Sequence, residues 1–298
     1  MNPEALRALA EACGAEFRAP EPLAPHLKLG IGGEAAFYAK PADWAGAERL
    51  LLGLWEAGVP FRVLGGGSNI LAAEGPLPFG VVHMGRLGGS ARWSGDLVEA
   101  DADVPVPALV AESVRRGLSG LEGMGGIPGS VGGAVIMNAG SFGNDMARIL
   151  REVATIERGR GRVWHPASDF TFDYRRSDVA ARGVVAGCRI RLAPADAGAV
   201  KLRFLEVKAL REGSQPTRAS TAGSVFKNPP GDYAGRILEG LGFKGRRLGA
   251  AGFSEMHANF LVNYGGATFS DAFALCEEAR SAAAGMGSDL QYEMEIWR

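Results

Sequence analysis

Two glycine-rich stretches carry the residue types and spacing best suited to binding an anion. The first, Gly65-Gly66-Gly67-Ser68-Asn69, follows an apolar segment, and the second runs from Leu121 to Gly143. Glycine has no Cβ and reaches positive φ at little cost, so consecutive amides can point at one anion. Each stretch is therefore either a nest for a pyrophosphate or a tight glycine turn packed against neighbouring backbone.

The second stretch has the length of a membrane span, because the 22 residues between Glu122 and Asp145 carry no charge. Eight of the 22 are glycine, and Pro128, Asn138 and Asn144 are further helix breakers. This composition argues against a spanning helix. We expect irregular backbone that passes close to a ligand or to other backbone.

Several common site motifs are missing from the sequence. Ile70 stands where a G-x-G-x-x-G fingerprint needs its third glycine, and no Gly-Lys pair offers a phosphate-binding P-loop. There is no G-x-S-x-G elbow. The histidines at 26, 83, 165 and 257 are scattered singly, so we expect no metal site.

Basic side chains occur in three further motifs. The segment F-T-F-D-Y-R-R-S at 170–177 is either a half-buried strand with a solvated edge or the carrier of an active-site arginine beside Tyr174. Lys227 and Lys244 lie in glycine-flanked motifs, A-G-S-V-F-K-N-P and G-F-K-G, in a chain with 6 lysines against 26 arginines. Each lysine is either a site residue or part of a solvated surface.

The elements that must position these residues follow from hydrophobic periodicity and turn chemistry. We expect a first helix that Asn2 caps and Gly14 ends. Further helices are expected at 44–58, 105–117, 200–212, 234–241 and 270–285, and strands near 60–64, 153–156, 163–165, 184–192 and 291–297.

The whole chain of 298 residues is long enough for two or three domains, with a candidate boundary at 213–216. Its net charge of -1 gives no case for binding nucleic acid or a membrane. Three separated cysteines offer neither a disulfide framework nor a CxxC site, and the N-terminus lacks a secretory signal. We therefore expect a cytoplasmic protein.

Seven motifs, read in order, resemble the UDP-N-acetylenolpyruvoylglucosamine reductase family over about residues 25–297. They are LGGGSNIL, GLEGMGGIPGSVGGAVIMNAGSFG, YRRS, QP with AGSVFKNP, GFKG, HANFLVN and YEMEI. Each is short, but the set in this order is specific. At this length the chain is more similar to the shorter type II branch, which lacks an extra loop in the substrate domain.

The resemblance implies an α+β fold with non-covalently bound FAD. The expected parts are FAD-binding subdomains at 1–82 and 83–213, of the vanillyl-alcohol-oxidase-like (PCMH-type) flavoprotein fold, and a substrate domain at 214–298 whose last strand returns to the flavin site. The implied cofactor-binding residues are Gly65, Gly66, Gly67, Ser68, Asn69, Gly125, Gly126, Ile127, Pro128, Gly129, Ser130, Gly132, Gly133 and Ala134.

The implied reaction is NADPH-dependent reduction of an enolpyruvyl ether on UDP-N-acetylglucosamine to UDP-N-acetylmuramate, for peptidoglycan. A hydride to the methylene carbon leaves negative charge at the carbon beside the carboxylate. By motif match Arg175 holds the carboxylate and the developing enolate, Ser224 is the general acid with Lys227 as helper, and Glu293 completes the site. The implied substrate contacts are Tyr174, Lys227, Asn228, Lys244 and Asn259.

The chain departs from the family pattern in two places. Glu295 stands where the family has an arginine, which leaves Glu295 as an alternative to Glu293, and period-2 alternation would place both on one face. A threonine is common in place of Lys28 or Leu29.

Two other functions stay open at this point. One is a flavoprotein oxidase or dehydrogenase of the same fold, and the other is a non-catalytic module that binds a nucleotide sugar or flavin. We expect a monomer or a weak homo-oligomer.

Overall fold

The protein, described by a computed structural model over residues 2–298, consists of two compact units whose segments alternate along the chain. Unit 1 contains the residues up to Pro20, Ala36–Gly66 and Phe79–Ala209, and unit 2 contains Glu21–Ala35, Gly67–Pro78 and Leu210–Arg298. These units differ from the contiguous ranges 1–82, 83–213 and 214–298. The reason is that two short N-terminal segments pair and pack with the C-terminal part of the chain.

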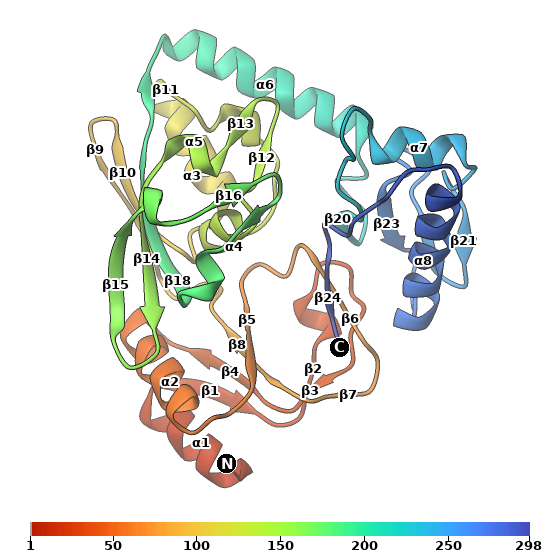
Figure 1. Ribbon diagram of the computed structural model, residues 1–298. Helices are drawn as coiled ribbons and strands as arrows, with labels where there is room; N and C mark the ends of the chain where they lie inside the picture. The colour runs from red at the N-terminus through yellow and green to blue at the C-terminus, as the bar shows by residue number, and fades with distance from the viewer. Residues whose placement is uncertain (1) are drawn as a thin grey trace. The chain divides into compact units, whose positions relative to one another are not determined.

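A four-stranded sheet with two helices forms the N-terminal part of unit 1 (Figure 1). Its strands, in sheet order, are β1 (Ala15–Arg18), β4 (Tyr38–Pro41), β8 (Gly80–His83) and β5 (Phe61–Leu64). The helices are α1 (Pro3–Ala12) and α2 (Trp44–Glu56). The side chains of Asn2 and Asp43 accept hydrogen bonds from the first turns of these helices, which sets where each begins. Strand β5 leads directly into Gly65.

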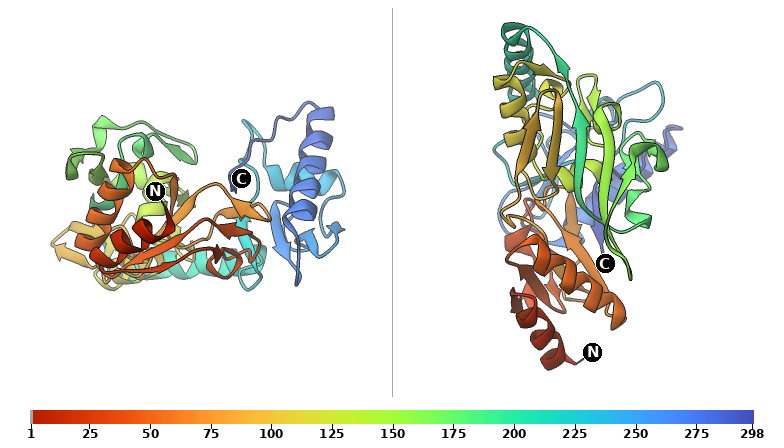
Figure 2. Two further views of the ribbon diagram at one scale, coloured as in Figure 1. Left: turned by 90° about the horizontal axis from the view of Figure 1, so that it is seen from below. Right: turned by 90° about the vertical axis from the view of Figure 1, so that its left-hand side faces the viewer.

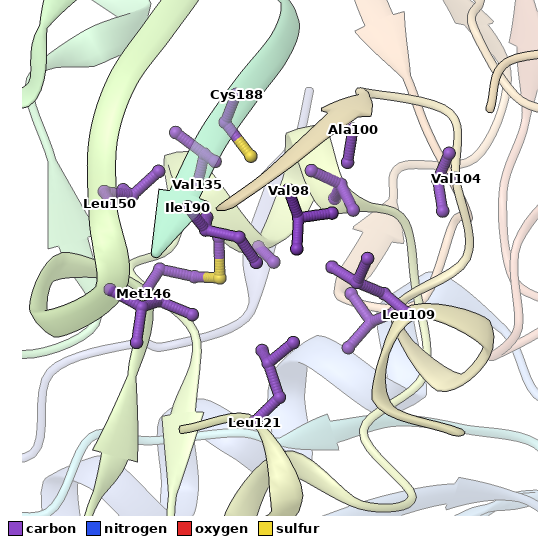
Figure 3. Packing of buried hydrophobic residues seen from close by; sticks show 14 of the residues in the cluster. Val98, Ala100, Val104, Leu109, Leu121, Val135, Met146, Leu150, Cys188 and Ile190 are labelled. Carbon is purple, nitrogen blue, oxygen red and sulfur yellow. The ribbon is translucent and has the colours of Figure 1, made fainter. Parts of the chain in front are cut away.

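An antiparallel five-stranded sheet forms the rest of unit 1. Its order is β15 (Gly161–Pro166), β14 (Leu150–Glu157), β18 (Val184–Arg191), β10 (Leu97–Asp101) and β9 (Ala91–Ser94). The helices α3 (Val106–Arg115), α4 (Val131–Ile136) and α5 (Met146–Ile149) contribute to the same core. Figure 3 shows Val98 and Ile190 of the sheet close to Leu109 of α3 and Val135 of α4. Val131, Ala134 and Val135 of α4 are buried in this core.

The uncharged run from Gly123 to Asn144 folds as short pieces, not as one helix. It contains most of a 3-10 turn (Glu122–Met124), then α4 and strand β12 (Gly140–Ser141), which pairs with β13 (Asn144–Asp145). Among residues 2–298, no helix is long and apolar enough to cross a membrane.

The remaining small elements of unit 1 are two strand pairs and two 3-10 turns. They are β11 (Leu118–Ser119) with β19 (Ala193–Pro194), β16 (Phe172–Asp173) with β17 (Arg176–Ser177), and the turns Ala167–Asp169 and Val179–Ala181. The segment 170–177, for which a half-buried strand was one of two expectations, contains a hairpin with a two-residue tip.

Unit 2 contains a four-stranded antiparallel sheet with α7 (Ala234–Gly240) and α8 (Phe269–Gly285) in the same core (Figures 1 and 2). The sheet order is β20 (Thr221–Ser224), β23 (Phe260–Asn263), β22 (Ala251–Phe253) and β21 (Arg247–Leu248). Two smaller sheets join β2 (Glu21–Pro22), β3 (Glu34–Ala35) and β7 (Pro76–Leu77), and β6 (Ile70–Ala72) with β24 (Glu295–Trp297). A 3-10 turn spans Ala24–His26, and α6 spans Ala197–Ser214.

The strand expected at 291–297 is split into two pairings. Tyr292 forms an antiparallel bridge with Phe226, whereas Glu295–Trp297 pairs in parallel with β6. Glu293 and Met294 both donate their amides to the carbonyl of Val225, which interrupts the regular ladder between them. Period-2 alternation therefore does not relate Glu293 to Glu295.

Candidate active site

Two loops meet at one edge of unit 1. An ideal Cβ on Gly66 would lie 3.0 Å from the Cα of Gly129, and one on Gly65 would lie 2.7 Å from the Oγ of Ser130. Contacts this short exclude larger side chains unless the loops move apart. The glycines of the two stretches therefore let one backbone approach the other.

The amides at this meeting point are available to a ligand. Among residues 2–298, the N–H groups of Gly65, Gly66, Gly129 and Ser130 donate no hydrogen bond to another protein group. Gly65, Gly129 and Ser130 are buried or half-buried and Gly66 is exposed. Buried amides normally have partners, so a cluster of amides without protein acceptors at a partly exposed position fits an anion such as a pyrophosphate.

The other predicted cofactor residues of the second stretch have different roles in the backbone. Gly132 donates its amide to the carbonyl of Ala102, and Gly133 and Ala134 donate to Ser130 in the first turn of α4. A Cβ on Gly132 would lie 2.9 Å from that of Ala102. Their contact with FAD stays a prediction. Their hydrogen bonds and the short distance between Gly132 and Ala102 show that they pack the first turn of α4.

The positions just before α4 are irregular. Gly126 and Gly129 have φ values of 81° and 117°, which suit glycine. Ile127 donates its amide to Met124, and Pro128 precedes Gly129. Gly125 packs against Phe204, since a Cβ there would lie 3.0 Å from that ring.

The second half of the Gly65–Asn69 motif belongs to unit 2. Gly67 has φ 60°, and a Cβ there would lie 2.3 Å from the carbonyl oxygen of His26. Ser68 follows, half-buried. The Nδ2 of Asn69 donates to the carbonyl of Glu293 at 3.0 Å, and the amide of Glu295 donates to the carbonyl of Asn69 at 2.9 Å. Asn69 therefore holds the backbone on both sides of Met294.

Ser224 and Glu293, two of the predicted catalytic residues, come from adjacent backbone segments. Ser224 ends β20, and the next residue, Val225, accepts the amide of Glu293 at 2.9 Å. Two residues on, Lys227 donates its amide to Gln291 at 2.8 Å. The structure thus brings Ser224, Lys227 and Glu293 together within unit 2. Arg175 belongs to unit 1.

Burial distinguishes the two candidate glutamates. The side chain of Glu293 lies in a half-buried position, whereas Glu295 is exposed at the start of β24. A carboxyl that works on a substrate needs a fixed and partly dehydrated position. The observed positions agree better with Glu293 than with Glu295.

The side-chain amide of Asn259 is hydrogen-bonded at both its oxygen and its nitrogen to the backbone that follows Ser224. It is 3% exposed, its Oδ1 accepts the amide of Phe226 at 2.9 Å, and its Nδ2 donates to the carbonyl of Phe226 at 2.8 Å. Its own carbonyl accepts the amide of Val225. Its predicted contact with substrate stays a prediction, but its support of the backbone next to Ser224 is visible.

The remaining predicted substrate residues of unit 2 lie around α7. The Oδ1 of Asn228 accepts the amide of Ala234 at 3.0 Å, and the ammonium of Lys244 lies 2.7 Å from Glu239. His257 is near them, and burial together with the charge of Lys244 lowers its pKa. Because the histidines are scattered in sequence, nothing in their spacing indicated His257.

Tyr174 and Arg175 form the tip of the β16–β17 hairpin in unit 1. A cavity of about 560 Å³ adjoins this tip and is lined by Asn138, Asp145, Ala147, Arg148, Phe172, Asp173, Tyr174 and Arg175. Tyr174 is 51% exposed, and the guanidinium of Arg175 lies 5.1 Å from its ring centroid. Two arginines, Arg148 and Arg175, and two aspartates, Asp145 and Asp173, line this open hollow, so its wall carries charges of both signs.

Within the described part of the chain, no group of three or more His, Cys, Asp or Glu side chains could hold a metal ion.

Comparisons with known proteins assign the chain to a family. A model described as "FAD binding domain" matches residues 35–165, and one described as "UDP-N-acetylenolpyruvoylglucosamine reductase, C-terminal domain" matches residues 215–297. The UDP-N-acetylenolpyruvoylglucosamine reductase of Anaeromyxobacter dehalogenans (strain 2CP-C) is 40% identical over 262 residues, which cover 87% of this chain and 79% of the relative. The chain belongs to the UDP-N-acetylenolpyruvoylglucosamine reductase family.

Solved structures agree with this family. The crystal structure of UDP-N-acetylenolpyruvylglucosamine reductase from Thermus caldophilus matches with a TM-score of 0.81 and 34% identity, covering 95% of this chain and 99% of that one. A variant of BBE-like 1 from Physcomitrella patens matches with a TM-score of 0.50 and 16% identity over 63% of this chain and 44% of its own, which shows the fold alone. The expected α+β, PCMH-type flavoprotein fold is confirmed.

The family matches establish an FAD-dependent oxidoreductase. The amide cluster at Gly65, Gly66, Gly129 and Ser130 lies within residues 35–165, which the FAD-binding model matches. The residues present therefore fit the cofactor that the family requires.

Proposed function

We propose that this chain catalyses the NADPH-dependent, FAD-mediated reduction of UDP-N-acetylglucosamine enolpyruvate to UDP-N-acetylmuramate, a step of peptidoglycan precursor synthesis. The observation that carries the proposal is the hydrogen-bonded pairing of the Ser224 segment with the Glu293 segment. This pairing lies inside the part of the chain that the family's C-terminal model matches.

The amides of Gly65, Gly66, Gly129 and Ser130 would hold the pyrophosphate of FAD. When bound, FAD supplies the hydride, which NADPH provides and the terminal methylene carbon of the substrate receives. No charged side chain is needed at the pyrophosphate, because oriented amides supply partial positive charge.

Arg175 would bind the substrate carboxylate and stabilise the charge that develops beside it. Once the methylene carbon gains a hydride, the electron pair of the double bond moves to the adjacent carbon and into the carboxylate oxygens. The planar guanidinium fork matches a carboxylate with two hydrogen bonds. An interaction that strengthens as charge develops lowers the barrier to the step.

Ser224 would donate its hydroxyl proton to that carbon, which completes a two-electron reduction. A serine hydroxyl is a weak acid, so the resulting alkoxide needs support. Lys227 is three residues away on the same segment and would supply a positive charge. Glu293, whose backbone bonds to Val225, would hold the enol through a hydrogen bond.

The experiment that tests the proposal separates the two halves of the reaction. Under anaerobic conditions NADPH should bleach the visible absorption band of the flavin, and the enolpyruvyl nucleotide sugar should restore it. Mass spectrometry should then show one equivalent of UDP-N-acetylmuramate per flavin. Restoration by oxygen but not by the sugar would instead favour an oxidase, and no bleaching at all would favour a binding module.

A further inference from the structure

The β16–β17 hairpin, which carries Arg175, is hydrogen-bonded at its base to the C-terminal end of α4. The Oγ of Ser177, in β17, lies 3.1 Å from the carbonyl oxygen of Val135 and 2.8 Å from that of Ile136. These carbonyls belong to the last turn of α4, where the carbonyl of Val135 also accepts the amide of Asn138 at 3.2 Å. Ser177 therefore joins the hairpin to the helix end.

Asn138 forms a second connection, close to the hairpin tip. It is 7% exposed, its Nδ2 donates to the carbonyl of Asp173 at 3.0 Å, and its Oδ1 accepts the amide of Ala147 at 3.0 Å. Its φ of 41° lies in the left-handed region, which asparagine tolerates better than most residues. One buried side chain thus ties the hairpin to α5.

Arg175 is itself held by the same loop. Its guanidinium donates to the carbonyl of Gly140, two residues after Asn138, and its φ is 55°. Left-handed backbone at an arginine is costly unless the surroundings fix it. The loop 138–140 and the end of α4 provide these surroundings through Asn138, Ser177 and Gly140.

Helix α4 is capped at its other end by Ser130, whose amide is one of the four at Gly65, Gly66, Gly129 and Ser130 that we call the cofactor cradle. Helix α4 spans only Val131–Ile136, or about 9 Å at the usual rise per residue. The cradle and the Arg175 hairpin are therefore attached to the two ends of one short, buried helix.

We propose that Asn138 is a positioning residue for Arg175 in the reduction of the enolpyruvyl substrate. This inference rests on the proposed function. Asn138 acts through the hydrogen bond to Asp173, which fixes the tip of the hairpin and so the direction of the guanidinium. Ser177 supports the same hairpin from its base.

The test uses Asn138→Ala and Ser177→Ala in the FAD-loaded enzyme. We expect flavin reduction by NADPH to stay within about twofold of wild type, because these side chains hold the hairpin and not the cradle. We expect reoxidation by the enolpyruvyl sugar to slow by about 10- to 100-fold, the scale of loss from a misplaced group. Ser177→Thr keeps the hydroxyl and should restore most of the rate.

A double-mutant cycle with Arg175→Ala separates positioning from general damage. If Asn138 acts through Arg175, adding Asn138→Ala to Arg175→Ala should cause no further loss of reoxidation rate. Asn144→Ala is the matched control, because Asn144 lies nearby in β13 and its Oδ1 accepts the amide of Gly123 and not a group of the hairpin. It should change the rate by less than about threefold.

Three outcomes would overturn the inference. They are an equal slowing of both half-reactions, full multiplication of the two losses in the double variant, and normal reoxidation in both Asn138→Ala and Ser177→Ala. If Asn138→Ala does not fold, Ser177→Ala and its cycle with Arg175→Ala decide alone. Failure of the wild-type flavin to be reoxidised by the sugar would overturn the proposed function and this inference with it.

Discussion

At the scale of single residues, the site in unit 2 depends on backbone bonds that fix two side chains at once. The carbonyl of Val225 accepts the amides of both Glu293 and Met294. The side chain of Asn259 forms hydrogen bonds with both the amide and the carbonyl of Phe226. Asn69 holds the carbonyl of Glu293. The directions of Ser224 and Glu293 are therefore coupled, because moving either segment breaks bonds to the other.

Ser224→Ala should leave the first half-reaction intact and block the second. The hydroxyl is the proposed proton donor, and alanine removes it while disturbing little else in a half-buried strand. We expect the reoxidation rate to fall at least about 100-fold, the lower range for general acid catalysis. Stopped-flow absorbance under nitrogen measures both rates. Normal turnover of this variant would exclude Ser224 as the general acid.

The two C-terminal glutamates provide a matched pair of substitutions. Glu293→Gln should slow reoxidation by the enolpyruvyl sugar by about 10-fold or more, since glutamine keeps the size but not the acid chemistry. Glu295→Gln, at an exposed position, should be near wild type. Both variants are compared in the same anaerobic assay. The opposite ranking would show that Glu295 is the active carboxyl.

At the scale of elements, the end of the β14–β15 pair contains a buried ionic cluster. Glu157 is 6% exposed, and its carboxylate contacts His165 at 2.5 Å and Arg160 at 2.9 Å. Burial opposes the ionisation of Glu157, but hydrogen bonds from His165 and Thr155 and the charge of Arg160 outweigh it, so its pKa is lowered. Folding is therefore linked to the ionised form.

The sign of this linkage predicts a loss of stability in acid. A carboxyl with a lowered pKa stabilises the fold at pH values above about 4.3, the unfolded value, and loses that contribution as the pH falls through the folded pKa. Urea midpoints measured from pH 7 to pH 3 should fall more for wild type than for Glu157→Gln. Glu56→Gln, an exposed control, should follow wild type. Parallel curves for all three proteins would contradict the linkage.

Local signals predicted many elements, because their causes are local. The caps and apolar spacing of α1, α2 and α8 lie within the helices themselves, and the expected bounds agree closely with the observed ones. The glycine content of 121–143 likewise indicated irregular backbone. The hydrogen bond from Asn138 to the hairpin could not be predicted from the sequence, because its partner Asp173 is 35 residues away.

At the scale of the whole molecule, the alternation of the two units could not be predicted from sequence. β6 pairs with β24, and Asn69 bonds to Glu293 across a separation of 224 residues. No local pattern in Ile70–Ala72 specifies a partner so distant, and contacts of this range also slow folding. The contiguous ranges expected from the sequence differ from the two units at the segments Glu21–Ala35 and Gly67–Pro78, which belong to unit 2.

Cofactor binding should be visible in the stability of the whole protein. FAD that binds the folded state alone stabilises it by about 2.7 kcal/mol when its free concentration is 100 times Kd. Added FAD should therefore raise the urea midpoint of the apoprotein. Gly66→Val should reduce this rise, because its side chain would meet Gly129, whose Cα lies 3.0 Å from an ideal Cβ at position 66.

Gly213→Val is the control for this substitution, since an added Cβ at Gly213 meets nothing within 4 Å. It should retain both the flavin after purification and the full FAD-dependent rise. The two variants without FAD should unfold at similar urea concentrations if the clash mainly displaces the loop and its amides. Full flavin retention by Gly66→Val, with an unchanged rise, would show that the Gly65–Gly66 and Gly129–Ser130 amides do not form the cofactor cradle.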